Sequence, residues 1–66
     1  MNLMESLLNE IERNAKLVER YRAIGPAGTF GAIMIQADID AAKAAIGSGD
    51  LPAMIQAHET LKNTED

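Results

Sequence analysis

The segment 32–46 most constrains how this chain can fold, because a helix over these residues would be apolar on two sides. On a helical wheel of about 100° per residue, the residues fall into two apolar stripes. The Phe30 stripe comprises Phe30, Ile33, Met34, Ala37, Ala41, Ala44 and Ala45. The Ile39 stripe comprises Ala32, Ile35, Ile39, Ala42 and Ile46. A surface helix needs one apolar stripe, so two stripes predict contacts on two sides of this helix.

One acidic residue interrupts the apolar surface of this predicted helix. Asp38 projects between the two stripes, opposite a narrow polar stripe that includes Gln36, Asp40 and Lys43. Because a charged carboxylate is rarely buried without a partner, Asp38 is expected to meet a polar group of another segment. His58 is the expected partner, as a polar pair that sets the register of two helices. The alternative is that Asp38 accepts hydrogen bonds from a ligand.

The size of the chain favours self-association. It has 66 residues, with 47% hydrophobic residues but one Phe, one Tyr, no Trp and no Cys. A single domain of this size buries only about 60% of its unfolded surface and is marginally stable alone. Without disulfides or a thiolate metal site, association of copies is the simplest further source of stability. We therefore expect one domain, 1–66, assembled as a homo-oligomer.

Charge and hydropathy limit the classes of partner. The net charge of −4 disfavours general binding to nucleic acid. No apolar run approaches the about 20 residues that span a bilayer, and the first residues lack the features of a signal peptide. One His and no Cys disfavour a metal site. No catalytic or cofactor signature is present, so we expect a non-enzymatic cytoplasmic protein without cofactor, membrane or nucleic-acid partner.

The apolar periodicity predicts a first helix over 3–23, with Leu7, Ile11 and Val18 on one face. Gly25 and Pro26 end it. Three basic residues, Arg13, Lys16 and Arg20, fall on its outer side and are expected to face solvent. In an oligomer, Arg20 is a second-rank ligand for the loop of a neighbouring copy.

A second helix is predicted over 29–46, with Thr29 as its N-cap, although Pro26 is an alternative start. A connector around Ser48 leads to a third helix over 51–62, capped by Asp50. Short connections favour antiparallel neighbours. The predicted fold is therefore all-α, an up-down-up arrangement of two long helices and one short helix.

The glycine-rich loop between the first two helices is the leading candidate site. Its glycines and the start of a helix can present backbone amides to an anion. The ligand-binding candidates at this loop are Tyr21, Arg22, Gly28, Thr29, Phe30 and Gly31. Arg22 would bind a phosphate from the core-facing side, and Tyr21 or Phe30 would stack on a base. The alternative is a tight turn whose glycines serve only close packing.

Three segments carry a resemblance to a class of proteins: residues 21–32 (YRAIGPAGTFGA), 46–50 (IGSGD) and 54–61 (MIQAHETL). Together they resemble small helical accessory proteins of temperate bacteriophages. Some phage proteins of this size and build act against host defence by sequestering nucleotide signals. The resemblance therefore implies an anti-defence role in the cytoplasm of a host cell.

Three functions follow as expectations, of which the third is a purely structural assembly piece of the phage. The first is an oligomer that binds and sequesters a phosphorylated small molecule, such as a cyclic nucleotide or an ADP-ribose-type signal, with Arg20, Asp38 and the loop residues as ligands. The second is a protein–protein inhibitor or adaptor that presents an apolar face of the second helix to a host defence protein.

Overall fold

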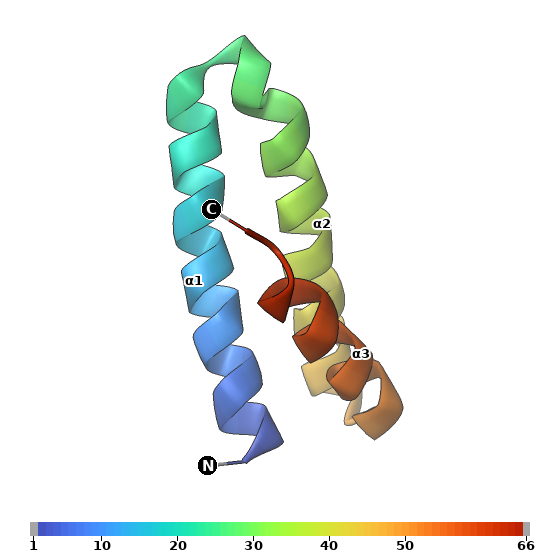
Figure 1. Cartoon of the computed structure of the whole chain (residues 1–66). Helices are drawn as coiled ribbons and strands as arrows, with labels where there is room; N and C mark the ends of the chain where they lie inside the picture. The colour runs from blue at the N-terminus through green and yellow to red at the C-terminus, as the bar shows by residue number, and fades with distance from the viewer. Residues whose placement is uncertain (1, 66) are drawn as a thin grey trace.

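The computed structural model describes residues 2–65 and contains three helices, with no strand in that range. They are α1 (Leu3–Ile24), α2 (Pro26–Ser48) and α3 (Leu51–Lys62). Figure 1 shows α1 and α2 side by side and α3 folded back beside them from the far end of α2. The prediction of an all-α fold is confirmed.

The first helix follows its predicted bounds to within one residue. Asn2 caps it, because its side-chain oxygen accepts a hydrogen bond from the Glu5 amide at 2.8 Å. The chain then leaves the helix through Gly25, whose φ of 94° lies in a region that disfavours side chains. Glycine at this position allows the abrupt change of direction that the next helix requires.

The predicted start of the second helix at Thr29 is wrong, and the alternative start at Pro26 is confirmed. Pro26 occupies the first helical position, where its missing amide costs little. Thr29 lies inside the first turn, and its hydroxyl donates to the Gly25 carbonyl at 3.3 Å instead of capping the helix. The helix also continues to Ser48, two residues beyond the prediction.

Because α2 continues beyond its predicted end, the connection to α3 is short. Gly49, with φ 65°, ends α2 in the left-handed conformation. Asp50 caps α3 by accepting a hydrogen bond from the Ala53 amide at 3.1 Å, and α3 has the predicted bounds of 51–62.

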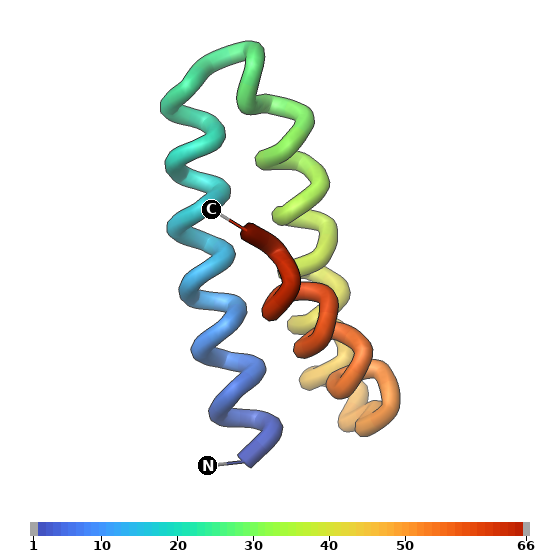
Figure 2. Tube along the Cα trace, in the orientation of Figure 1, coloured from blue at the N-terminus to red at the C-terminus, as the bar shows by residue number. Residues whose placement is uncertain are grey.

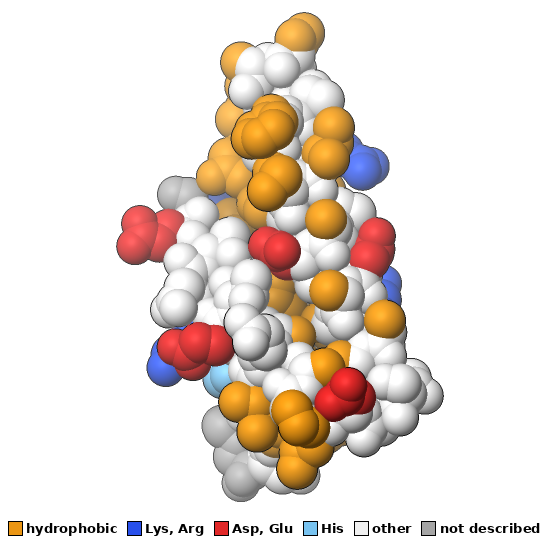
Figure 3. All heavy atoms as spheres, turned by 90° about the vertical axis from the view of Figure 1, so that its right-hand side faces the viewer, with side chains coloured by type: hydrophobic (Ala, Val, Ile, Leu, Met, Phe, Trp, Pro, Cys, Tyr) orange, Lys and Arg blue, Asp and Glu red, His pale blue; other side chains and the backbone are white. Residues whose placement is uncertain are grey.

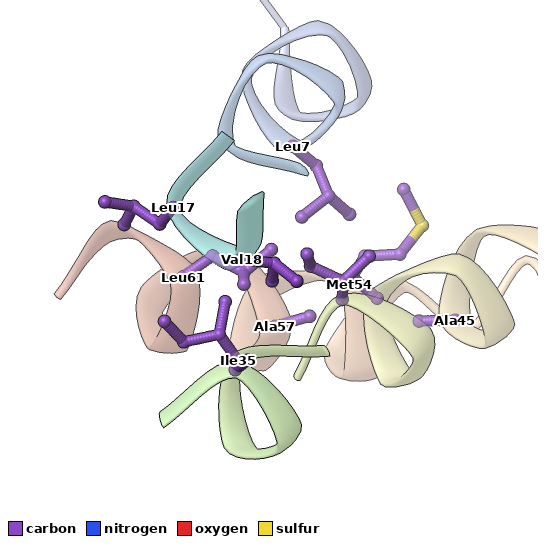
Figure 4. Packing of buried hydrophobic residues seen from close by; sticks show 11 residues of the cluster. Leu7, Leu17, Val18, Ile35, Ala45, Met54, Ala57 and Leu61 are labelled. Atoms are coloured by element: carbon purple, nitrogen blue, oxygen red, sulfur yellow. The ribbon is translucent and has the colours of Figure 1, made fainter. Parts of the chain in front are cut away.

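The Ile39 stripe of α2 forms the centre of the core. Ala32, Ile35, Ile39 and Ala42 are each at most 6% exposed. They pack in a cluster with buried residues of both other helices, several of which Figure 4 labels. The cluster's members from α1 and α3 are Leu7, Leu17, Val18, Met54, Ala57 and Leu61. One apolar stripe of α2 is thus used within the chain itself.

The C-terminal end of α3 is held by polar side chains of α1. Arg13 donates from Nη2 to the carbonyl oxygens of Leu61 and Thr64, at 2.7 and 3.0 Å. Asn14 is fully buried and donates from Nδ2 to Leu61 at 3.2 Å. These donors satisfy carbonyls that a helix end leaves without intrahelical partners. The expectation that Arg13 faces solvent is therefore wrong.

The long α1–α2 pair extends beyond α3 on the side of the Gly25 connection. Figure 2 shows the trace of the C-terminal segment ending beside the middle of α1. At the end of the pair that carries the glycine-rich loop, α1 and α2 therefore pack against each other without α3.

Replacing Arg13 by Met should lower the free energy of unfolding by about 1.5–3 kcal/mol, because a charged donor to the Leu61 and Thr64 carbonyls is lost together with the 2.9 Å ion pair to Glu10. Urea unfolding followed by circular dichroism measures this change. Lys16→Met is the matched control: Lys16 is exposed, its ion pair with Glu12 spans 3.7 Å, and its loss should cost less than about 1 kcal/mol. Equal effects of the two substitutions would contradict the capping role of Arg13.

Candidate functional site

The glycine-rich loop is a site of close helix packing. Gly28 is buried, and a Cβ added to it would collide with the Tyr21 carbonyl. Its amide donates to the Gly25 carbonyl at 2.9 Å. Gly28 therefore permits the backbones of α1 and α2 to approach each other, and its N–H is already paired within the chain.

The neighbouring loop residues also contact one another. The Tyr21 ring lies over Gly31, with its Cδ2 atom 3.4 Å from the position that a Cβ on Gly31 would take. This contact confirms the expected proximity of Tyr21 and Gly31. Because Tyr21 is half-buried against α2 and the Thr29 hydroxyl is bonded within the turn, both groups serve packing here.

The remaining candidates at this end are exposed. Arg20 and Arg22 lie on the surface, and Phe30 is 74% exposed. The predicted core-facing placement of Arg22 is wrong. At the start of α2 no side chain caps the helix, and its first turn carries no acidic residue. An exposed guanidinium at the end of α1 and an exposed aromatic ring in α2 thus lie close in sequence to a helix start that has no side-chain cap.

Gly28→Ala should lower the free energy of unfolding by about 1–3 kcal/mol, because the helices must separate to admit the methyl group. Gly47→Ala is the matched control, since a Cβ at this helical position meets no atom within 4 Å. It should raise stability by about 0.5–1 kcal/mol, as expected for Ala over Gly in a helix. Chemical denaturation of the two variants makes the comparison. If Gly28→Ala were as stable as Gly47→Ala, the close approach would not exist.

The Phe30 stripe forms an exposed apolar feature of the described surface. Phe30, Ile33 and Met34 are 74%, 58% and 50% exposed, and of the stripe only Ala45 is buried. The stripe's alanines at 37, 41 and 44 are exposed as well. Figure 3 shows the resulting hydrophobic side chains along this face, most densely toward the loop end of the molecule. We call this surface the outer face of α2.

The outer face continues toward the loop. Ile24, at the end of α1, is 60% exposed. Exposed apolar patches on a small protein are typical of interaction sites. A helix that is apolar on nearly all sides is also typical of a buried helix. The second contact predicted from the sequence is therefore not made within one copy of the described chain.

A groove lies beside the outer face, between α2 and α3. It has a volume of about 210 Å³ and is partly open to solvent. Its lining residues are Asp38, Ala41, Ala53, Gln56, Ala57 and Thr60. Asp38 is half-buried there, and among the described residues it makes no hydrogen bond or ion pair. The structure thus places a carboxylate beside three alanines and two neutral polar side chains.

His58 does not pair with Asp38. No hydrogen bond or ion pair joins the two side chains, and the α3 residues that line the groove with Asp38 are Ala53, Gln56, Ala57 and Thr60 instead. The reason is rotational: Met54, Ala57 and Leu61 turn into the core, so His58 lies on a different side of α3. Antiparallel spacing alone could not settle which side faces α2.

Asn14 is a buried polar residue that the sequence alone did not identify. It is 0% exposed, its Nδ2 donates to Glu10 and Leu61, and its Oδ1 has no partner among the described residues. The sequence does indicate its burial, because Asn14 follows the apolar Leu7 by seven residues and therefore lies on the same face of the helix. The position indicates a structural role in holding α3.

In comparisons with known proteins, no family model, no curated protein and no solved structure matches the chain. Within residues 2–65, none of the helices combines the length and apolar character needed to cross a membrane. The same residues contain no group of three or more His, Asp or Glu side chains placed to hold a metal ion. The case for function therefore rests on the outer face, the groove and the loop end.

Proposed function

We propose that this chain is a non-enzymatic interaction protein, an inhibitor or adaptor, that binds another protein surface through the outer face of α2. The single observation that carries the proposal is the exposure of Phe30, Ile33 and Met34 on the same side of the most apolar helix. Such anchors at i, i+3 and i+4 are the spacing used when one helix lies in the groove of another protein. This role agrees with the anti-defence class suggested by the resemblance.

A second copy of the chain is one protein that fits this face. Large side chains occupy its N-terminal half, and Ala37, Ala41 and Ala44 occupy its C-terminal half. In an antiparallel pairing of two α2 helices, the large half of one copy meets the small half of the other. Interdigitation of large and small side chains favours close packing. Homo-oligomerisation is thus part of the proposal, with the same face as interface.

Ile33→Glu tests the face, because Ile33 is exposed and its replacement should leave the fold intact. We expect it to weaken association by about tenfold or more, since an apolar anchor in an interface contributes on the order of 1–2 kcal/mol. Sedimentation equilibrium at micromolar protein concentration measures self-association. Affinity capture from host extract followed by reconstitution with the purified partner measures binding to another protein.

Asn9→Glu is the matched control, because it introduces the same charge at an exposed position on α1. It should leave both measurements unchanged. A folded wild-type chain that is monomeric and captures no stoichiometric partner would overturn the proposal. A folded Ile33→Glu variant that associates as the wild type does would overturn it equally.

The loop end favours a second candidate function, sequestration of a phosphorylated small molecule. The supporting observation is the uncapped start of α2 beside two exposed side chains, Arg22 and Phe30. The helix start and the guanidinium both favour a phosphate, and the ring offers a stacking face. Arg20 would contribute from α1, within an oligomer. Because Gly28 and Thr29 already serve packing within the chain, they are less available to a ligand, and this function is therefore the second candidate.

Thermal or urea unfolding in the presence of cyclic nucleotides and ADP-ribose derivatives tests this second function. A bound ligand should raise the free energy of unfolding by about 2.7 kcal/mol at a hundredfold excess over its dissociation constant. Arg22→Gln should remove that gain without changing the stability of the free protein. If no compound of the panel stabilises the protein, the interaction role stands alone.

A further inference from the structure

The groove between α2 and α3 combines three features that bear on what it could bind. Its carboxylate, Asp38, has no hydrogen-bond or ionic partner in the described part of the chain. Its walls include Ala41, Ala53 and Ala57, whose short side chains leave the space between the helices open. Its volume of about 210 Å³ exceeds the about 150 Å³ at which a protein cavity accepts a guest the size of benzene.

We propose that this groove is a binding site for a cation on an aliphatic stem, namely a Lys or Arg side chain of the protein segment that lies on the outer face of α2. The alanine walls would contact the methylene groups of the stem. The charged end would reach Asp38, and the Gln56 side chain and Thr60 hydroxyl at the same groove supply polar groups beside it. The proposal rests on the interaction role proposed above and specifies the chemistry of the partner.

The charge and the burial of Asp38 exclude other classes of ligand. A carboxylate repels phosphates and other anions, so the groove is not a continuation of a phosphate site. A purely apolar guest would leave the half-buried carboxylate without a partner, which is costly. A divalent metal ion needs several oxygen ligands, and Asp38 is the only acidic residue among those that line the groove. A long basic side chain fits both parts of the groove, because its apolar stem can contact the alanine walls and its charged end can pair with Asp38.

The groove and the outer face are continuous, which explains why one partner would occupy both. Ala41 belongs to the exposed Phe30 stripe and also lines the groove. A segment whose apolar side chains cover Ile33 and Ala37 would therefore run directly past Asp38. A basic residue beside its apolar anchors would bind Asp38 and orient the segment, since charge pairs of this kind contribute more to specificity than to affinity.

The site can be tested without knowing the partner, by using n-butylammonium chloride as probe and 1-butanol as its neutral analogue of the same stem length. Two-dimensional ¹H–¹⁵N NMR spectra of the full chain report binding residue by residue. We expect the ammonium probe to shift the amide signals of Ala41, Ala53 and Ala57 in a saturable way, at a lower concentration than 1-butanol does. Asp38→Asn should raise the dissociation constant of the ammonium probe at least tenfold and leave that of 1-butanol unchanged.

Asp40→Asn is the matched control, because Asp40 lies on the same helix but on its exposed polar stripe, where Gln36 donates to it at 3.0 Å. It should not change binding of the probe. Ala53→Leu supplies a second variant: it fills the groove without altering the carboxylate, and it should abolish the shifts. Equal affinity of the ammonium and the alcohol, or equal effects of Asp38→Asn and Asp40→Asn, would overturn the proposal.

Failure of this inference can be told apart from failure of the proposed function. Ile33→Glu should leave binding of n-butylammonium intact, because Ile33 does not line the groove. If the wild-type chain binds the probe through Asp38 but neither self-associates nor captures a partner, the cation site stands and the interaction role fails. If association depends on Ile33 but the probe binds equally to wild type and Asp38→Asn, the interaction role stands and the cation site fails.

Discussion

The rest of the structure depends on the contact that the Ile39 stripe of α2 makes with both other helices. Ile39, Leu7 and Leu61 come from three different helices and are each at most 1% exposed. A chain of 66 residues has few large side chains, so the three helices must share one central cluster. Because α2 contributes the middle of that cluster, the positions of α1 and α3 are both defined relative to it.

Because the apolar core is small, polar side chains of α1 also hold α3 in place. The short α3 helix contributes only Met54, Ala57 and Leu61 as buried residues. The donors from Arg13 and Asn14 hold its C-terminal end against α1 at the carbonyls of Leu61 and Thr64. Charged and buried donors to helix-end carbonyls give a direction to a contact that apolar packing alone leaves free to slide.

The division of α2 into an inner and an outer face connects the fold to function. Its inner face is used by the chain, whereas the Phe30 stripe is exposed with large residues at one end and alanines at the other. Ala41 belongs both to the exposed stripe and to the lining of the groove. The outer face and the groove thus form one continuous surface with an apolar part and one negative charge, a combination suited to a partner that is apolar and locally basic.

The sequence by itself determined the helical class, the bounds of the first and third helices to within one residue, and the existence of two apolar sides on the central helix. These features are local, because they depend on periodicity, capping residues and glycine within a few positions along the chain. Pro26 and Thr29 both suit a helix start, and in the structure α2 begins at Pro26, directly after Gly25 with its φ of 94°. Only the tertiary structure decided which apolar stripe is buried, that Gly28 packs against the Tyr21 carbonyl, and that Arg13 caps α3. It also turned Ala57 instead of His58 toward the core. The reason is that each of these outcomes depends on the rotation of one helix against another, which no spacing within a single helix encodes.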